Sequence, residues 1–195
     1  MRRPRLAART FLALVAISAA AMLVMAATSV MAMRRLYADA TLAALGQCAA
    51  ALANEAGSSG AMSGTQAADR FCDTAAAGTG LRVTAVAPDG TVLGDSESDP
   101  AAMENHAGRP EIASALGGSA ATGMRPSPTL GITMAYAAAP VGAPGSEAGV
   151  MRVAMAASEL SSAVAPFALA SLAVAAAMVA AMAVASARVW RSEER

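Results

Sequence analysis

The sequence predicts an α+β domain, one antiparallel sheet with flanking helices, inserted between two transmembrane helices. Two stretches without a charged residue, 10–33 and 160–187, each exceed the roughly 20 apolar residues that a helix needs to cross a bilayer. Between them lie about 125 residues in which short apolar and polar alternations are separated by Gly and Pro, a pattern typical of strands and turns. A segment of this length can bury one modest core.

The two stretches divide the chain into five parts. These are a cytoplasmic tail over 1–10, a first transmembrane helix over 11–33, an extracytoplasmic domain over 34–163, a second transmembrane helix over 164–187 and a cytoplasmic tail over 188–195. Four arginines precede the first span and three follow the second, so the positive-inside rule predicts that both termini are cytoplasmic. Arg34 and Arg35 lie on the opposite side of the first span, but the N-terminal cluster is larger. The sequence therefore predicts a membrane protein with an extracytoplasmic central domain.

The first span also has features of a cleaved signal peptide, since a basic start is followed by small residues around Ala26 and Ala27. Its apolar core is longer than the about 7–15 residues of a signal peptide, and we therefore favour an uncleaved anchor. Both spans are rich in Ala, and small residues let membrane helices approach closely, which gives weak support for a homodimer. All fourteen basic residues are Arg, so compositional bias competes with packing as the explanation.

The segment 36–162 is acidic, with twelve Asp and Glu against five Arg, which argues against nucleic acid as a partner. Cys48 and Cys72 are the only cysteines, and an extracytoplasmic location permits a disulfide between them. Burial as two free thiols is an equal alternative, because Cys packs as a small apolar residue. No CxxC or Cys/His ligand pattern is present, so we expect neither a metal site nor a cofactor.

The extracytoplasmic domain begins with two predicted helices. The segment 36–55 continues the first span and places four side chains on one side, which are Leu42, Leu45, Cys48 and Leu52. A Gly/Ser-rich run over 57–64 ends this helix. The second helix, over 66–77, buries Phe71 and Cys72 before Gly78 and Gly80 stop it.

Strands and one short helix fill the rest of the domain. Alternation over 81–86, a Pro88-Asp89-Gly90 turn and a second run over 91–94 predict a hairpin, which an acidic loop over 95–99 follows. Pro110 then begins a short helix that Gly117 ends, with Glu111 complementing its positive end.

Three further strands are expected after that helix. The first, over 119–125, is an edge strand because Pro126 and Pro128 cut it short. Alternation of Ile132, Met134 and Tyr136 marks the second, and that of Met151, Val153 and Met155 marks the third. A Pro/Gly loop over 140–149 connects these two strands.

Three segments of the domain carry a resemblance to a known family. They are LRVTAVAPDGTVLGDSESDP at 81–100, MENHAGRPEIASALGG at 103–118 and RPSPTLGITMAYAAAPV at 125–141. Together with the two spans, they resemble the N-terminal half of bacterial sensor histidine kinases of the phosphate-regulon type. The resemblance implies a PAS-like or single-Cache fold that senses a signal outside the cell and passes it through the spans to a kinase core.

The chain departs from that family after residue 187, where eight residues follow without a phosphoacceptor His box or an ATP-binding domain. We therefore expect no enzymatic activity of this chain and interpret it as the sensing half of a kinase whose catalytic half is missing or separate. The alternative is a stand-alone membrane protein that binds an envelope partner or regulates a kinase in trans. A periplasmic enzyme is disfavoured, because one histidine and no supporting motif cannot form a Ser/His/Asp or Cys/His arrangement.

Candidate ligand-binding residues are Arg109, Arg125 and His106. Two arginines could hold an anionic ligand, since guanidinium groups bind carboxylate and phosphate in bidentate fashion, but pairing with neighbouring acids is the favoured alternative. His106 is the sole imidazole, and we expect a structural role in the loop before the Pro110 helix rather than metal binding or pH sensing. The acidic residues at 95–99 lack the spacing of a calcium-binding loop, and a solvated loop is favoured. The nature of the ligand is not predicted.

Overall fold

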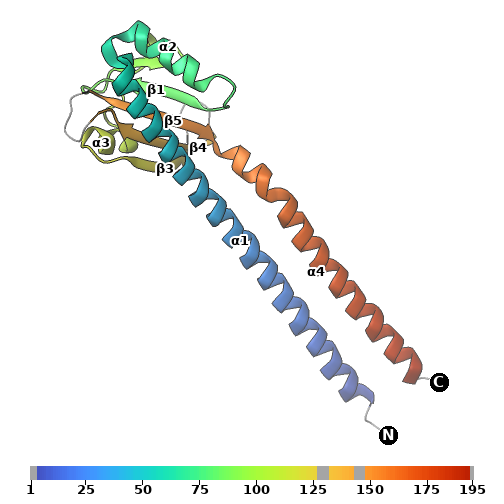
Figure 1. Ribbon diagram of the computed structural model, residues 1–195. Helices are drawn as coiled ribbons and strands as arrows, with labels where there is room; N and C mark the ends of the chain where they lie inside the picture. Colours follow the sequence, from blue (N-terminus) through green and yellow to red (C-terminus); the bar gives the residue numbers. More distant parts are fainter. Residues whose placement is uncertain (1–3, 127–131, 143–147, 194–195) are drawn as a thin grey trace. The chain divides into compact units, whose positions relative to one another are not determined.

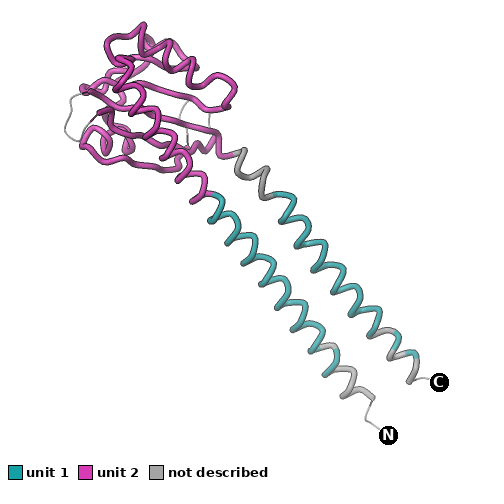
Figure 2. Tube along the Cα trace, viewed as in Figure 1, with its two compact units in different colours: residues 1–37, 160–195 teal, residues 38–159 magenta. Residues whose placement is uncertain are grey.

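The computed structural model describes residues 4–126, 132–142 and 148–193 of the chain. It forms two compact units, one made of Met1–Tyr37 with Leu160–Arg195 and the other of Ala38–Glu159 (Figure 2). The elements in chain order are α1 (Pro4–Ser59), η1 (Ala61–Ser63), α2 (Thr65–Ala76), β1 (Arg82–Val86), β2 (Val92–Asp95), η2 (Pro100–Ala102), α3 (Pro110–Leu116), β3 (Ala121–Pro126), β4 (Thr133–Pro140), β5 (Val150–Ala156) and α4 (Ala157–Glu193).

The first unit consists of the N-terminal part of α1 and most of α4, which run side by side with the two chain ends at the same end of the pair (Figure 1). Both helices contain a stretch that is long and apolar enough to cross a membrane, within Ala13–Ser59 and over Ala165–Ala185. Ala175 is the only buried apolar residue of the described part of α4, which places a small side chain at the contact between the helices.

The second unit is built on a five-stranded antiparallel sheet with the order β2-β1-β5-β4-β3. This confirms the predicted α+β class and the predicted succession of helices and strands, to which the structure adds the short 3₁₀ turns η1 and η2. The strand predicted at the edge is the edge strand β3, which ends at Pro126. Part of the predicted Pro/Gly loop, residues 143–147, lies outside the described residues.

The main core lies between one face of the sheet and the helices α1 and α2. Side chains of β1, β4 and β5 that point to this face, such as Val83, Ala137 and Val153, have no exposed area. The sheet packs against a row of buried residues on α1, spaced three or four positions apart, namely Leu45 and the smaller Ala49, Ala53 and Ala56. Of the four side chains predicted on this helix face, Leu45 belongs to the buried row, while Leu42, Cys48 and Leu52 are only partly buried against it.

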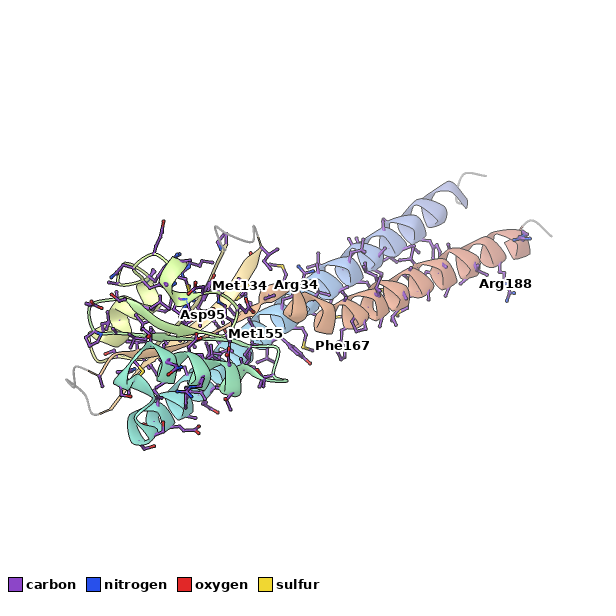
Figure 3. The ribbon with its side chains drawn as sticks, turned by 90° about the horizontal axis from the view of Figure 1, so that it is seen from above. Arg34, Asp95, Met134, Met155, Phe167 and Arg188 are labelled. Atoms are coloured by element: carbon purple, nitrogen blue, oxygen red, sulfur yellow. The ribbon has the colours of Figure 1, made fainter. Side chains whose placement is uncertain are left out.

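The opposite face of the sheet, called the α3 face below, is covered only in part. Ile112 and Ala115 of α3 pack against Val86, Ala138 and Val150, and this small cluster is fully buried. Figure 3 labels Asp95 and Met134, which belong to the α3 face, and Met155, which packs with the main core. The rest of the α3 face is where polar side chains gather.

Candidate functional site

Strand alternation and register bring polar residues together on the α3 face. Thr84 of β1 is opposite Arg152 of β5, and Ala154 of β5 lies between Arg82 of β1 and Tyr136 of β4. Residues opposite one another in an antiparallel sheet point to the same face. Three strands therefore supply two arginines and one tyrosine to one surface.

A cavity of about 850 Å³ lies against this surface. The sheet supplies its floor, and the segment between β2 and α3, which includes η2, supplies the remaining wall. The residues that line it are Arg82, Ser98, Asp99, Ala102, Met103, Glu104, Asn105, His106, Gly108, Arg109, Met134, Tyr136, Arg152 and Ala154. Its size is that of a small-molecule site, which typically encloses about 300–1,000 Å³.

One carboxylate holds two guanidinium groups beside the cavity. The Glu111 side chain is 5% exposed and accepts two hydrogen bonds from Arg125, at 2.7 Å and 2.9 Å, and one from Nε of Arg152 at 3.1 Å. Both guanidinium groups also lie over the ring of Tyr136, with 4.3 Å and 4.4 Å to its centroid. These four residues are called the Glu111 cluster. It carries one more positive than negative charge.

Arg152 has free donors at the cavity. Its side chain is 7% exposed, and among the described residues only its Nε has a hydrogen-bond partner. Burial lowers the pKa of this guanidinium, while the Glu111 charge raises it; an arginine nevertheless stays protonated at any physiological pH. The Nη groups of Arg152, which lines the cavity, are therefore available to an anionic ligand.

Arg82, by contrast, is fully engaged. Its Nε donates to both carboxylate oxygens of Asp95 at 3.0 Å, and Nη2 donates to the Ser98 hydroxyl at 3.2 Å. The Asp95 carboxylate also accepts the Thr84 hydroxyl at 2.6 Å. Asp95 was predicted to lie in a solvated loop, and this was wrong: it is the last residue of β2, it is 3% exposed, and its buried charge is compensated by these partners.

His106 lies in the cavity wall and is 5% exposed. Its Nδ1 is 2.7 Å from the Glu104 carbonyl oxygen, and since a carbonyl only accepts, Nδ1 carries the proton of the neutral ring. Burial lowers the pKa of this imidazole, and the charges of Arg152 and Arg109 act in the same direction, against the Glu104 carbonyl bond. The ring is thus held neutral among cationic neighbours.

The three predicted ligand-binding residues take different places. His106 and Arg109 line the cavity, and Arg109 has no ion-pair partner within the described part of the chain. Arg125 is not in the lining; it pairs with Glu111, as the alternative interpretation had it. Glu111, which was predicted to complement the positive end of the helix, is buried and forms ion pairs with Arg125 and Arg152.

The sequence interpretation missed Arg152, Arg82 and Tyr136 as cavity residues. A signal for all three was present, because each lies in a strand whose alternation was recognised. On β5, Arg152 lies between core residues Met151 and Val153 and so must point to the other face. Burying an arginine in the middle of a strand costs free energy unless its guanidinium group has a partner. Arg152 could therefore have indicated that the α3 face carries polar side chains.

Both cysteines belong to the main core and not to the cavity. Cys72 of α2 is fully buried and Cys48 of α1 is partly buried against the same cluster, and both are free thiols. A disulfide between them remains a prediction. No three His, Cys, Asp or Glu side chains gather as metal ligands anywhere in the described ranges.

The architecture defines the class of protein fold to which the second unit belongs, an α+β domain with α1 and α2 on one face of an antiparallel sheet and with α3 and a cavity on the other. A solved structure with this fold is the sensor domain of the histidine kinase DctB from V. cholerae, with a TM-score of 0.57 and 18% sequence identity. The similarity covers 71% of this chain and 57% of the DctB chain, so the present chain matches little more than half of that structure. No protein-family model and no curated protein matches the sequence.

Proposed function

We propose that the chain is the signal-sensing module of a two-component sensor histidine kinase, anchored in the bacterial inner membrane, and that it binds a small anionic ligand in the cavity of the α3 face. The observation that carries the proposal is the cavity itself, which has free guanidinium donors in its floor and wall. The fold shared with the DctB sensor domain supports the sensing role, and the PAS-like or single-Cache resemblance of three segments supports the same interpretation.

The charges around the cavity favour an anion. Asp95 compensates the charge of Arg82. The Asp99 and Glu104 carboxylates also line the cavity, but both are exposed and water screens their charges. Against them stand Arg109, which has no ion-pair partner among the described residues, and the excess positive charge of the buried Glu111 cluster. Guanidinium groups in a partly dehydrated cavity bind carboxylate or phosphate strongly.

The first unit supports membrane anchoring through the side chains that it exposes. Leu14, Ile17 and Leu169 are 63%, 66% and 68% exposed, and Phe167, labelled in Figure 3, is 53% exposed. A soluble protein rarely leaves such a continuous apolar surface in water, whereas lipid tails accommodate it. The arginines at both chain ends support cytoplasmic termini, with the second unit extracytoplasmic. We also propose that the module acts as a homodimer, for which the small residues of the Ala-rich spans are the support.

The ligand is best sought with anions of different charge and shape. The likeness to phosphate-regulon kinases suggests inorganic phosphate, and the guanidinium geometry suits carboxylates equally, so the probes are phosphate, malonate and acetate. The full chain in lipid nanodiscs is titrated with each probe by isothermal titration calorimetry. We expect at least one anion to bind and to raise the Tm, because a ligand that binds only the folded state stabilises it.

Two variants and a control connect binding to the cavity. Removing one charged donor costs about 1.5–3 kcal/mol, so R109Q and R152Q should each weaken binding about tenfold or more. R70Q removes an arginine that is exposed on α2 and that bonds, among the residues described, only the Gln66 carbonyl; this variant should bind as the parent chain does. If no probe binds, or if R70Q weakens binding as much as R109Q does, the anion site is excluded.

A fusion of the full chain to a reporter kinase core tests the sensing role. An anion that binds in the calorimeter should change the kinase output, and R109Q should abolish the response at the same ligand concentration. A ligand can shift the output only if it binds one signalling state more tightly than the other. An anion that binds but never alters the output, at any concentration, would contradict a sensing role.

A further inference from the structure

We propose that Glu111 is a built-in counter-anion that sets how tightly the cavity binds its ligand and which ligand charge it prefers. The inference rests on the proposed anion-binding function and adds a specificity-determining residue to it. Glu111 is not in the cavity lining, so it acts on the ligand through Arg152, whose Nε it holds and whose Nη groups it leaves for the ligand.

The geometry makes Arg125 and Arg152 competitors for one carboxylate. Oε2 of Glu111 accepts from Arg125 at 2.7 Å, whereas Oε1 is shared between Arg125 at 2.9 Å and Arg152 at 3.1 Å. Arg125 thus forms the shorter, bidentate ion pair with Glu111, whereas Arg152 contacts a single Glu111 oxygen that it shares with Arg125. The positive charge of Arg152 is incompletely neutralised, and an anion in the cavity completes it.

The charges around the cavity predict whether it binds dianions or monoanions more tightly. The excess charge of the Glu111 cluster and the charge of Arg109 together offer two positive charges to the ligand, opposed only by the exposed and water-screened carboxylates of Asp99 and Glu104. A dianion such as malonate should therefore bind more tightly than acetate. Without the Glu111 charge the same cavity would offer three, and both its anion affinity and its preference for the dianion should rise.

Arg125 is a positioning residue in this scheme. It has no place in the cavity lining, but its bidentate pairing keeps Glu111 from neutralising Arg152 fully. Loss of Arg125 would free both Glu111 oxygens for Arg152 and reduce the charge offered to the ligand. The two members of one ion pair are thus expected to change anion affinity in opposite directions, which a merely structural ion pair would not do.

The test measures malonate, phosphate and acetate binding by calorimetry on the full chain in nanodiscs, at one ionic strength. E111Q should bind malonate about tenfold more tightly than the parent, have a lower Tm without ligand and gain more Tm on malonate addition. R125Q should bind malonate several-fold more weakly. The matched control E55Q removes the same charge from an exposed position on α1 and should leave the affinity unchanged.

The outcomes separate this inference from the proposed function. If the parent chain and E111Q bind none of the three anions, the anion site itself is wrong. If the parent binds but E111Q binds equally or more weakly, only the role of Glu111 is overturned. Should E111Q fail to fold, R125Q decides alone: weaker malonate binding supports the inference, and unchanged or tighter binding overturns it.

Discussion

His106 is a titratable residue buried in the cavity wall, and it links stability to pH. Its pKa in the folded state is lowered by burial and by the adjacent arginines, below the ordinary value of about 6.5. As the pH falls through that value, the unfolded chain takes up a proton that the folded chain refuses. Stability is therefore lost as the pH falls from about 6.5 toward the lower folded-state pKa, by up to about 1.4 kcal/mol per pH unit.

The substitution H106Q tests this dependence, because glutamine keeps a polar side chain and does not titrate. Thermal unfolding of the full chain in detergent is followed between about pH 7.5 and pH 5.5, a range in which few unperturbed carboxylates change charge. The parent should lose Tm over this range, and H106Q should lose distinctly less. Parallel Tm curves for the two proteins would show that His106 does not contribute.

Among single residues, the sequence identified the cavity residues that lie in the loop before α3, but not those that the sheet contributes to the cavity. His106 and Arg109 lie in a segment whose loop character is local, and turns and prolines mark it. The pairing of Glu111 with Arg152 joins residues 41 positions apart. No local period encodes such a contact, which exists only once α3 packs on β5.

The close contact between α2 and β2 is an element-scale feature that depends on one glycine. A Cβ placed on Gly94 would collide with the α2 backbone at Ala68 and Asp69, so a side chain cannot be added without moving the helix. Gly123 on β3 is the matched control, because nothing lies within 4 Å of a Cβ built there. G94A should lower the free energy of unfolding by about 1–3 kcal/mol or more, and G123A by far less.

Denaturant unfolding of the two variants measures this difference, and near-equal midpoints would refute the close-contact argument. Cys72 provides a second readout, since its thiol is buried on α2 and burial, with the Asp95 charge, raises its pKa to about 12. It should resist alkylation in the parent chain and in G123A. In G94A the displaced helix should expose it to the reagent.

Elements were more predictable than contacts between them. Strands β1, β4 and β5 follow from alternation, and α3 begins and ends at the expected Pro110 and Gly117. The α1 face was predicted from helical spacing to consist of Leu42, Leu45, Cys48 and Leu52. In the structure the buried positions of α1 also include Ala49 and Ala53, whose small side chains are 0% and 1% exposed.

For the whole molecule, the proposed arrangement places the two units in different solvents. Apolar side chains are exposed along the first unit, while the second unit buries its core and carries a surplus of acidic residues. Only the first unit therefore suits the interior of a bilayer. The arginines at both ends favour cytoplasmic termini, and with this proposed topology we expect the cavity to face the extracytoplasmic compartment.

Cysteine labelling in intact bacterial cells tests this topology. In a C48A background, Q66C on the exposed side of α2 should react with a membrane-impermeant maleimide applied from outside the inner membrane. R188C, near the C-terminal end of α4, should react only after the cells are lysed. Labelling of R188C from outside, or a lack of labelling of Q66C, would contradict the proposed topology. The cavity would then lie in a compartment that an external anion does not reach. The buried Cys72 should stay unreactive in every arm and so serves as the internal check that the second unit is folded.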